Sequence, residues 1–493
     1  MTANHLLWLV LLLGLFGLSA CGSPPPEGLR FAIASAPVTL DPRFATDATS
    51  ARINRLIYQR LIDFDSTNRA MPALANWQQL DERHYRFQLI GEPAFHDGKP
   101  LQASDVLATY QSVLDPATAS PHRAALKLIE SMAVIDPRTI DFHLNKADPL
   151  FPAYLVIGIV PGELLAAQHP FNTQPLGSGP FQFIAWPEEG RLQLKRLSDQ
   201  LPITFLRVKD PTVRALKLLN GEVDLLQNNL PAEIVQHLAE QGMQVERRAG
   251  SNFSYLGFNF EDPVTGQQVV REAIAYALDR QSIIHYVFAG GARLATSLLP
   301  PSHWAGHPDL TPYPYDPDRA RALLASIGVD SEHPLTISYK TSNDPFRIRL
   351  ATVIQQQLGE VGIKVHIQSY DWGTFYGDIK KGGFQMYSLA WVGIKTPDIY
   401  RYVFHSDAVP PNGANRGRYL DPAVDRLIEQ AESAASQQAR IAAYRALQER
   451  VFNSLPYVPL WYEDHLSVAR PEISGYLLSS DGNYDGLIHV QRD

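Results

Sequence analysis

The segment Phe384–Asp398, FQMYSLAWVGIKTPD, decides the fold because it predicts a buried strand that ends at a tryptophan. Up to Trp391 both alternating sets of residues are largely apolar, as in a strand whose sheet is covered on both faces. Val392-Gly393 then turns the chain, and Thr396-Pro397-Asp398 ends the regular structure. Ligands of open α/β sheets bind outside the carboxyl ends of strands. Trp391 is therefore either a core residue before a loop or part of a ligand site.

The composition is that of an ordinary globular protein, with 493 residues, 45% hydrophobic and 19% charged. This length predicts two or three domains. The net charge is -8, and no basic run stands out, so we expect no nucleic-acid partner. A single cysteine excludes an internal disulfide and a cysteine-based metal site. We expect neither a metal nor another cofactor.

Cys21 follows an uncharged apolar run, Leu6–Leu18, that is too short to span a bilayer. The stretch Leu18-Ser19-Ala20-Cys21-Gly22 resembles a bacterial lipoprotein signal, although no Lys or Arg precedes the run. The alternatives are a secretory signal cleaved after an Ala and an uncleaved anchor. We expect 1–20 to be the signal peptide and 21–28 to be a lipidated Cys21 with a Pro-rich tether.

The periodicity predicts a strand-rich region first and an α/β region from Pro202 onwards. Ser104 is the predicted N-cap of a helix to Leu114. Strand Leu335–Tyr339, helix Phe346–Gly359 and strand Ile363–Ser369 predict a βαβ unit. A long apolar strand is predicted at Phe253–Phe260, and a strand-like return is predicted at Pro456–Leu460.

Several motifs, in this order, resemble solute-binding protein family 5, the oligopeptide and dipeptide class of ABC importers. The most specific is Phe95-His96-Asp97-Gly98-Lys99-Pro100 with Ala103-Ser104-Asp105-Val106, a near match to F-H-D-G-x-P-x-x-A-x-D-V. The others are Thr39-Leu40-Asp41-Pro42, Leu56–Leu61, Leu176–Phe181, Val270–Arg280 and Tyr315–Leu324. The resemblance covers essentially the whole chain after the signal.

The resemblance implies a two-lobed α/β fold like that of periplasmic binding proteins, of the class II type. It places lobe I at 29–256, with a strand-rich insertion at about 63–180, lobe II at 257–462, and a return to lobe I at 463–493. The lobes would be crossed near Tyr255–Asn259 and Leu460–Ser467. Ligand would bind between lobes that close by hinge motion.

The resemblance also implies site residues. In peptide binders of the family, the ligand lies extended along the strand that ends at this tryptophan, and backbone pairs with backbone. The residues carried over are Ala390, Trp391, Val392, Trp372, Thr46, Asp47 and Ala48.

One position departs from the pattern of the peptide binders. They carry an Asp three residues after this tryptophan, which pairs with the α-ammonium of the ligand, and here that residue is Ile394. Either Asp398 or Asp47 replaces it, or the ligand lacks a free α-ammonium, since an unpaired buried ammonium costs several kcal/mol. The alternative for Asp398 is a solvated residue that caps the following helix.

The resemblance thus implies a lipid-anchored, monomeric solute-binding protein that delivers peptides to a membrane permease at the cell envelope. A second hypothesis keeps the transport role but changes the ligand to an N-blocked or cyclic peptide, an opine, a sugar or a metal chelate. A third is an envelope enzyme. No nucleophile–base arrangement is visible in the sequence, so we expect no catalytic residues.

Overall fold

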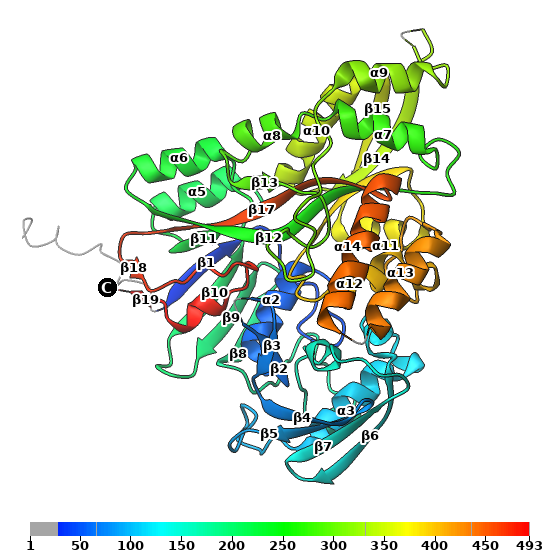
Figure 1. Cartoon of the computed structure of the whole chain (residues 1–493). Helices are drawn as coiled ribbons and strands as arrows, with labels where there is room; N and C mark the ends of the chain where they lie inside the picture. Colours follow the sequence, from blue (N-terminus) through cyan, green and yellow to red (C-terminus); the bar gives the residue numbers. More distant parts are fainter. Residues whose placement is uncertain (1–27, 66, 331, 435, 493) are drawn as a thin grey trace, which may run out of the picture.

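The computed structural model describes residues 28–65, 67–330, 332–434 and 436–492. Cys21 and the predicted signal lie outside the described residues. A large mixed sheet runs through the described chain (Figure 1). Its strands in spatial order are β15 (Ile363–Tyr370), β14 (Leu335–Ser342), β16 (Met386–Trp391), β12 (Gln244–Phe258), β17 (Tyr457–Ala469), β11 (Leu225–Gln227), β1 (Leu29–Ile33), β10 (Pro202–Arg207), β9 (Arg191–Arg196) and β8 (Phe181–Glu188), with β13 (Ala292–Leu294) paired to β17.

The two long central strands, β12 and β17, are antiparallel partners, and the other strands of the sheet lie to either side of them. They are 15 and 13 residues long, so both are longer than the strand predicted at Phe253–Phe260 and the strand-like return predicted at Pro456–Leu460. The polar start of β12 gives no strand pattern, and it is extended because its backbone pairs with β17. A register shift interrupts the pairing between Arg248 and Asn252.

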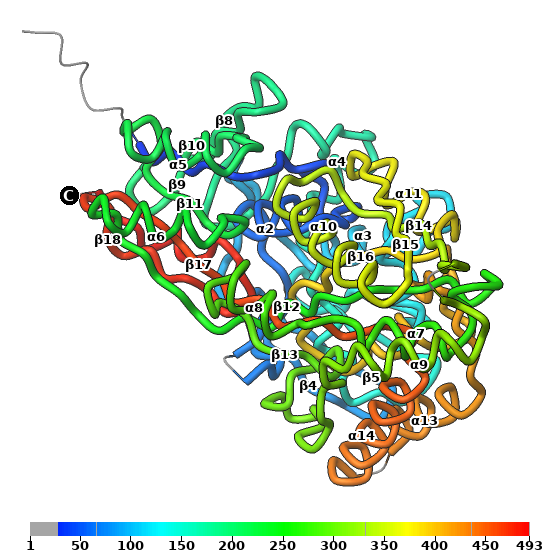
Figure 2. The backbone as a smooth tube through the Cα atoms, turned by 90° about the horizontal axis from the view of Figure 1, so that it is seen from above, coloured from blue at the N-terminus to red at the C-terminus, as the bar shows by residue number. Residues whose placement is uncertain are grey.

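The first side of the sheet carries β11, β1, β10, β9 and β8. Its core combines Phe31 and Phe205 with residues near the C-terminus, including Tyr476 and Leu487. Arg492 Nη1 donates a hydrogen bond of 3.1 Å to the carbonyl of Gly28, so both ends of the described chain meet on this side (Figure 2). Its helices are α2 (Ala48–Ile57), α5 (Pro211–Leu219) and α6 (Ala232–Glu240), and the short strands β18 (Ile473–Ser474) and β19 (Gln491–Arg492) pair beside it.

The second side carries β14, β15 and β16. The predicted βαβ unit is confirmed, since β14 and β15 are parallel and α10 (Pro345–Gly359) connects them. Asp344 caps α10 by accepting hydrogen bonds from two backbone amides. The other helices of this side are α7 (Gln268–Ala277), α8 (Arg280–Tyr286), α9 (Pro317–Ala325), α11 (Trp372–Lys381), α12 (Ile399–Phe404), α13 (Pro422–Ser433) and α14 (Gln437–Ser454).

A separate four-stranded antiparallel sheet forms the lower part of the molecule in Figure 1. It has its own core, which includes Phe87, Tyr110 and Phe142. The N-cap predicted at Ser104 was wrong: the helix begins at Ala103, and the Asp105 carboxylate accepts a 2.8 Å hydrogen bond from the backbone of Gln102. The elements here are β4 (Ala75–Asp81), β5 (His84–Leu89), β7 (Thr139–Leu144), β6 (Ile129–Asp136), α3 (Ala103–Leu114), α4 (Gly162–Ala166) and the hairpin β2 (Ile62–Phe64) with β3 (Ala70–Pro72).

Candidate ligand-binding site

A cavity of about 750 Å³ lies where the end of β16 faces the start of α2. Its walls come from segments far apart in sequence, namely α2, the turn after β14, α11, the end of β16 and the loop around Asp481. The volume lies within the range of small-molecule sites, about 300–1,000 Å³. The carboxyl end of β16 thus opens into a cavity, which favours the second of the two alternatives that the sequence leaves open for Trp391.

One edge of β16 has no neighbouring strand along the cavity. β12 pairs with β16 along its whole length, from Met386 to Trp391. On the opposite edge β14 pairs only with Met386 and Tyr387. Among the described strands, none covers Ser388–Trp391 on that side. An exposed strand edge presents backbone donors and acceptors that can pair with an extended chain.

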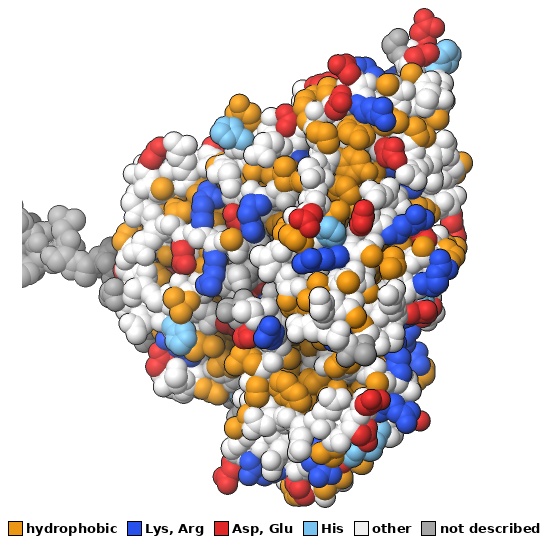
Figure 3. Space-filling view, viewed as in Figure 1, with side chains coloured by type: hydrophobic (Ala, Val, Ile, Leu, Met, Phe, Trp, Pro, Cys, Tyr) orange, Lys and Arg blue, Asp and Glu red, His pale blue; other side chains and the backbone are white. Residues whose placement is uncertain are grey.

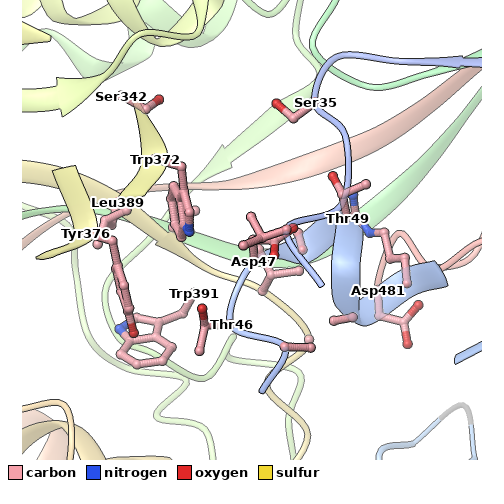
Figure 4. A pocket seen from close by; sticks show the side chains of 18 of the residues that line it. Ser35, Thr46, Asp47, Thr49, Ser342, Trp372, Tyr376, Leu389, Trp391 and Asp481 are labelled. Atoms are coloured by element: carbon pink, nitrogen blue, oxygen red, sulfur yellow. The ribbon is translucent and has the colours of Figure 1, made fainter. Parts of the chain in front are cut away.

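Aromatic side chains form the wall beside this edge (Figure 4). Trp372 and Tyr376 stack with ring centroids 5.3 Å apart and an interplanar angle of 9°. Their i, i+4 spacing in α11 places both rings on one face of the helix. Trp391 lies below them in the view of Figure 4 and also lines the cavity. Tyr376 was missed from the sequence, although its spacing from Trp372 was the available signal.

Asp47 faces these rings from the N-terminus of α2, between Thr46 and Ala48 (Figure 4). Its Oδ1 accepts a 2.8 Å hydrogen bond from the Ser50 amide and so caps the helix. Its Oδ2 is buried without a hydrogen-bond partner among the residues that the structure describes. Burial raises the pKa of the Asp47 carboxyl above its usual value, although the hydrogen bonds to Ser50 oppose this.

The two positions that concern the ammonium anchor lie outside the cavity lining. Ile394 is 8% exposed and packs in a core with Phe384 and Tyr400. Asp398 occupies the N-cap position of α12 without making a capping hydrogen bond, and its carboxylate accepts from the Thr396 hydroxyl. Burial, together with the nearby carboxylate of Asp148, raises the pKa of Asp398 to about 7. Asp47 is therefore the better placed of the two candidate anchors.

An ion pair joins the loop after β16 to the C-terminal segment. Lys395 Nζ lies 2.9 Å from Asp481 Oδ2, and both residues line the cavity. Burial opposes ionisation of Asp481, but the charge of Lys395 and the hydrogen bond from Ser479 lower its pKa below its usual range. Where the peptide binders described above have a carboxylate at position 394, this chain has an apolar residue followed by a cation.

Metal-ligating side chains also approach one another on the separate sheet. Within the described ranges, His84, Asp141 and His143 could offer ligand atoms that all lie within 4.8 Å of one another. None of them lines the cavity, and Arg86 already holds the Asp141 carboxylate with two hydrogen bonds of 2.8 Å. No helix in the described part of the chain is both long and apolar enough to cross a bilayer.

Fold and site together define a two-lobed α/β binding protein whose cavity lies at the end of a sheet strand. The family model of bacterial extracellular solute-binding proteins, family 5, matches residues 69–409, and the chain belongs to this family. The fold class predicted from the sequence is confirmed.

Named relatives cover nearly the whole chain. A probable di/tripeptide-binding protein 5 of Pseudomonas aeruginosa is 27% identical over 95% of this chain and 94% of its own. Heme-binding protein A of Haemophilus influenzae is 28% identical over 94% of this chain and 92% of its own. The crystal structure of the ABC transporter-associated periplasmic binding protein DppA from Helicobacter pylori, in complex with the peptide STSA, matches with a TM-score of 0.85 and 25% identity, over 94% of this chain and 98% of that one.

Proposed function

We propose that this protein is the extracytoplasmic solute-binding component of an ABC importer, and that it binds a peptide or peptide-like ligand and delivers it to a membrane permease. The unpaired edge of Ser388–Trp391 inside a ligand-sized cavity carries this proposal. An extended ligand adds to that edge as a further strand, so affinity comes largely from its backbone. Relatives named for di- and tripeptide binding support the ligand class.

We further propose that the ligand has a blocked or absent α-amino group. Ile394 offers no carboxylate, and Asp398 does not line the cavity. The competing candidate is Asp47, whose Oδ2 has no hydrogen-bond partner in the described part of the chain. The alternative ligand classes are cyclic peptides, opines, sugars and metal chelates. The similarity to a protein named for heme binding supports a non-peptide ligand as an alternative.

The role is binding rather than catalysis, in a monomer held at the membrane surface by lipid on Cys21. Several acyl chains on one residue retain a protein at a membrane far better than one chain does. The proposed boundaries remain 29–256 and 463–493 for lobe I and 257–462 for lobe II. The C-terminal segment supports this division, because it packs in one core with β1 and β10.

The ligand class can be tested by purifying the protein under native conditions and then denaturing it. Mass spectrometry identifies the small molecules that are released. We expect a peptide or a peptide-like molecule. Reproducible release of a different class, such as a sugar, from the wild-type protein and not from Trp391→Ala would overturn the peptide proposal.

A further inference from the structure

The charge of the cavity is opposite to that of the whole chain. The chain has a net charge of -8, and Figure 3 shows acidic and basic side chains mixed over one face. The cavity lining contains eight basic residues and four acidic ones. The basic residues are Arg52, Arg55, Arg60, Arg207, Lys209, Arg347, Lys395 and Arg416, and the acidic ones are Asp47, Asp63, Asp344 and Asp481.

Five of these eight cations already have an acidic partner. The pairs are Arg55 with Asp63 and Asp485, Arg60 with Asp63, Arg207 with Glu189, Arg347 with Glu463 and Lys395 with Asp481. Arg52, Lys209 and Arg416 form no ion pair with any residue that the structure describes. Lys209 is exposed, so water can solvate its charge. Arg52 and Arg416 are more buried, so their missing acidic partners indicate what the ligand could supply.

Arg416 is 6% exposed and lies beneath the aromatic wall. The carbon atom at the centre of its guanidinium is 4.7 Å from the ring centroid of Trp391 and 5.2 Å from that of Tyr376. It donates long hydrogen bonds, of 3.3 and 3.2 Å, to the hydroxyls of Tyr255 and Tyr376. Stacking and neutral acceptors compensate a buried guanidinium only in part, because it has five N–H donors and suits a carboxylate.

The acceptors around Arg416 are neutral hydroxyls. Besides Tyr255 and Tyr376 it lies near Tyr387 and Tyr457, whose hydroxyls are buried without a hydrogen-bond partner among the described residues. The indole nitrogen of Trp391, which donates only, is buried without a hydrogen-bond partner in the described structure. Tyr255, which accepts one of the hydrogen bonds from Arg416, stacks on Tyr457 with the ring centroids 3.8 Å apart. Neither of these neighbours is a carboxylate. A buried guanidinium that meets only neutral acceptors beside a cavity indicates a ligand that supplies a negative charge.

Arg52 faces the cavity from α2, on the opposite wall. It is half-buried, and its Nε has no hydrogen-bond partner within the described residues. Its guanidinium carbon lies 5.6 Å from the ring centroid of Tyr484. Together with burial, its charge lowers the pKa of His465 to about 4, which keeps that neighbour neutral at pH 7. Two cations without acids thus approach one cavity from two different elements.

We propose that the ligand is anionic, a peptide-like molecule whose carboxylates bind to Arg416 and Arg52. This inference rests on the proposed function and specifies its substrate class. A carboxylate accepts hydrogen bonds from two N–H donors of a guanidinium and neutralises a charge that has no acidic partner in the described structure. Acidic peptides and other peptide-like polycarboxylates share this chemistry.

Calorimetric titration with N-acetylated tripeptides tests the inference. One pair of peptides differs by Glu or Gln at one position, and the other pair differs by a free or an amidated C-terminus. We expect each carboxylate to improve affinity by about tenfold or more. In Arg416→Met this preference should fall below about threefold, whereas Arg416→Lys keeps part of it. Arg52→Met tests the second cation independently if Arg416→Met fails to fold. Arg349→Met, at an arginine that pairs with Glu233 and does not line the cavity, is the control and should retain the preference.

The outcomes separate this inference from the function on which it rests. Neutral and acidic peptides that bind the wild-type protein equally well would overturn the inference and leave peptide binding intact. Binding of neither set would overturn both. A preference for carboxylates that survives in both Arg52→Met and Arg416→Met would also overturn it.

Discussion

Lys395 and Asp481 form an ion pair of 2.9 Å across the cavity, with side chains only 17% and 9% exposed. They join the loop after β16 to a segment that follows β17, so the pair holds two walls of the cavity together. Removing one partner leaves a mostly buried charge behind. We predict that Lys395→Met lowers the free energy of unfolding by about 3 kcal/mol in urea titrations.

The exposed pair of Lys127 and Asp407 provides the control. It also joins distant segments, but its side chains are 55% and 47% exposed and 3.4 Å apart. Lys127→Met should therefore cost less than about 1 kcal/mol. Equal effects of the two substitutions would show that the pair at the cavity contributes nothing beyond surface electrostatics.

Asp398 should make stability depend on pH. Its pKa rises from 3.8 to about 7 on folding, because of burial and the nearby carboxylates of Asp148 and Glu432. The folded state then binds the proton more tightly, so stability from this group is complete below about pH 4 and is lost as the pH rises to about 7.

Asp398→Asn should remove this dependence. A pKa shift of this size corresponds to about 4 kcal/mol. Because Asp398 is only half-buried, we expect Asp398→Asn to raise the free energy of unfolding at pH 8 by about half of that. Urea unfolding of both proteins from pH 4 to pH 8 measures it. A variant that is less stable than the wild type at pH 8 would mean that the ionised carboxylate is needed in the fold.

Trp391 should contribute to binding more than to folding. Trp391→Ala should weaken binding of the best N-acetylated peptide by about 2 kcal/mol, as for a central aromatic contact. Its far-UV circular dichroism and cooperative unfolding should persist, because Trp391 lines the cavity. The contrasting variant is Phe142→Ala, which removes a core residue that is 0% exposed and does not line the cavity, and it should cost about 3–5 kcal/mol of stability. An unfolded Trp391→Ala protein would assign Trp391 to the core instead.

Local signals in the sequence predict much of the fold and part of the cavity. Asp344-Pro345 marks the start of the helix in the βαβ unit, and it acts through its immediate neighbours. Seven of the nine site residues that the resemblance to the family implies line the cavity. The exceptions are Ile394 and Asp398. They follow Gly393, whose φ of 70° turns the chain and directs them elsewhere.

The features that depend on long-range packing could not be predicted. Arg416 lies in a loop that reads as a polar turn, and only the fold brings it under Trp391. Asp481 is 86 residues from its partner Lys395, so no periodicity connects them. The length of β17 likewise depends on pairing with β12 rather than on its own residues.

Cys21 should determine where the protein resides. If it carries lipid, Cys21→Ser should move the protein from the membrane fraction to the soluble fraction of the cell envelope. Immunoblots of fractionated cells measure this, and Ser23→Ala, two residues further along, is the control that should stay with the membrane. Unchanged retention of Cys21→Ser would overturn the lipid anchor.

The central claim is that an extended ligand without a free α-ammonium binds along the edge of Ser388–Trp391. Calorimetric titration with matched free and N-acetylated peptides tests it most directly. We predict that the acetylated peptides bind at least as tightly as the free ones, and that Asp47→Asn leaves this order unchanged. Free peptides that bind about tenfold more tightly or better would contradict the claim. Loss of that advantage in Asp47→Asn would then identify Asp47 as the ammonium anchor.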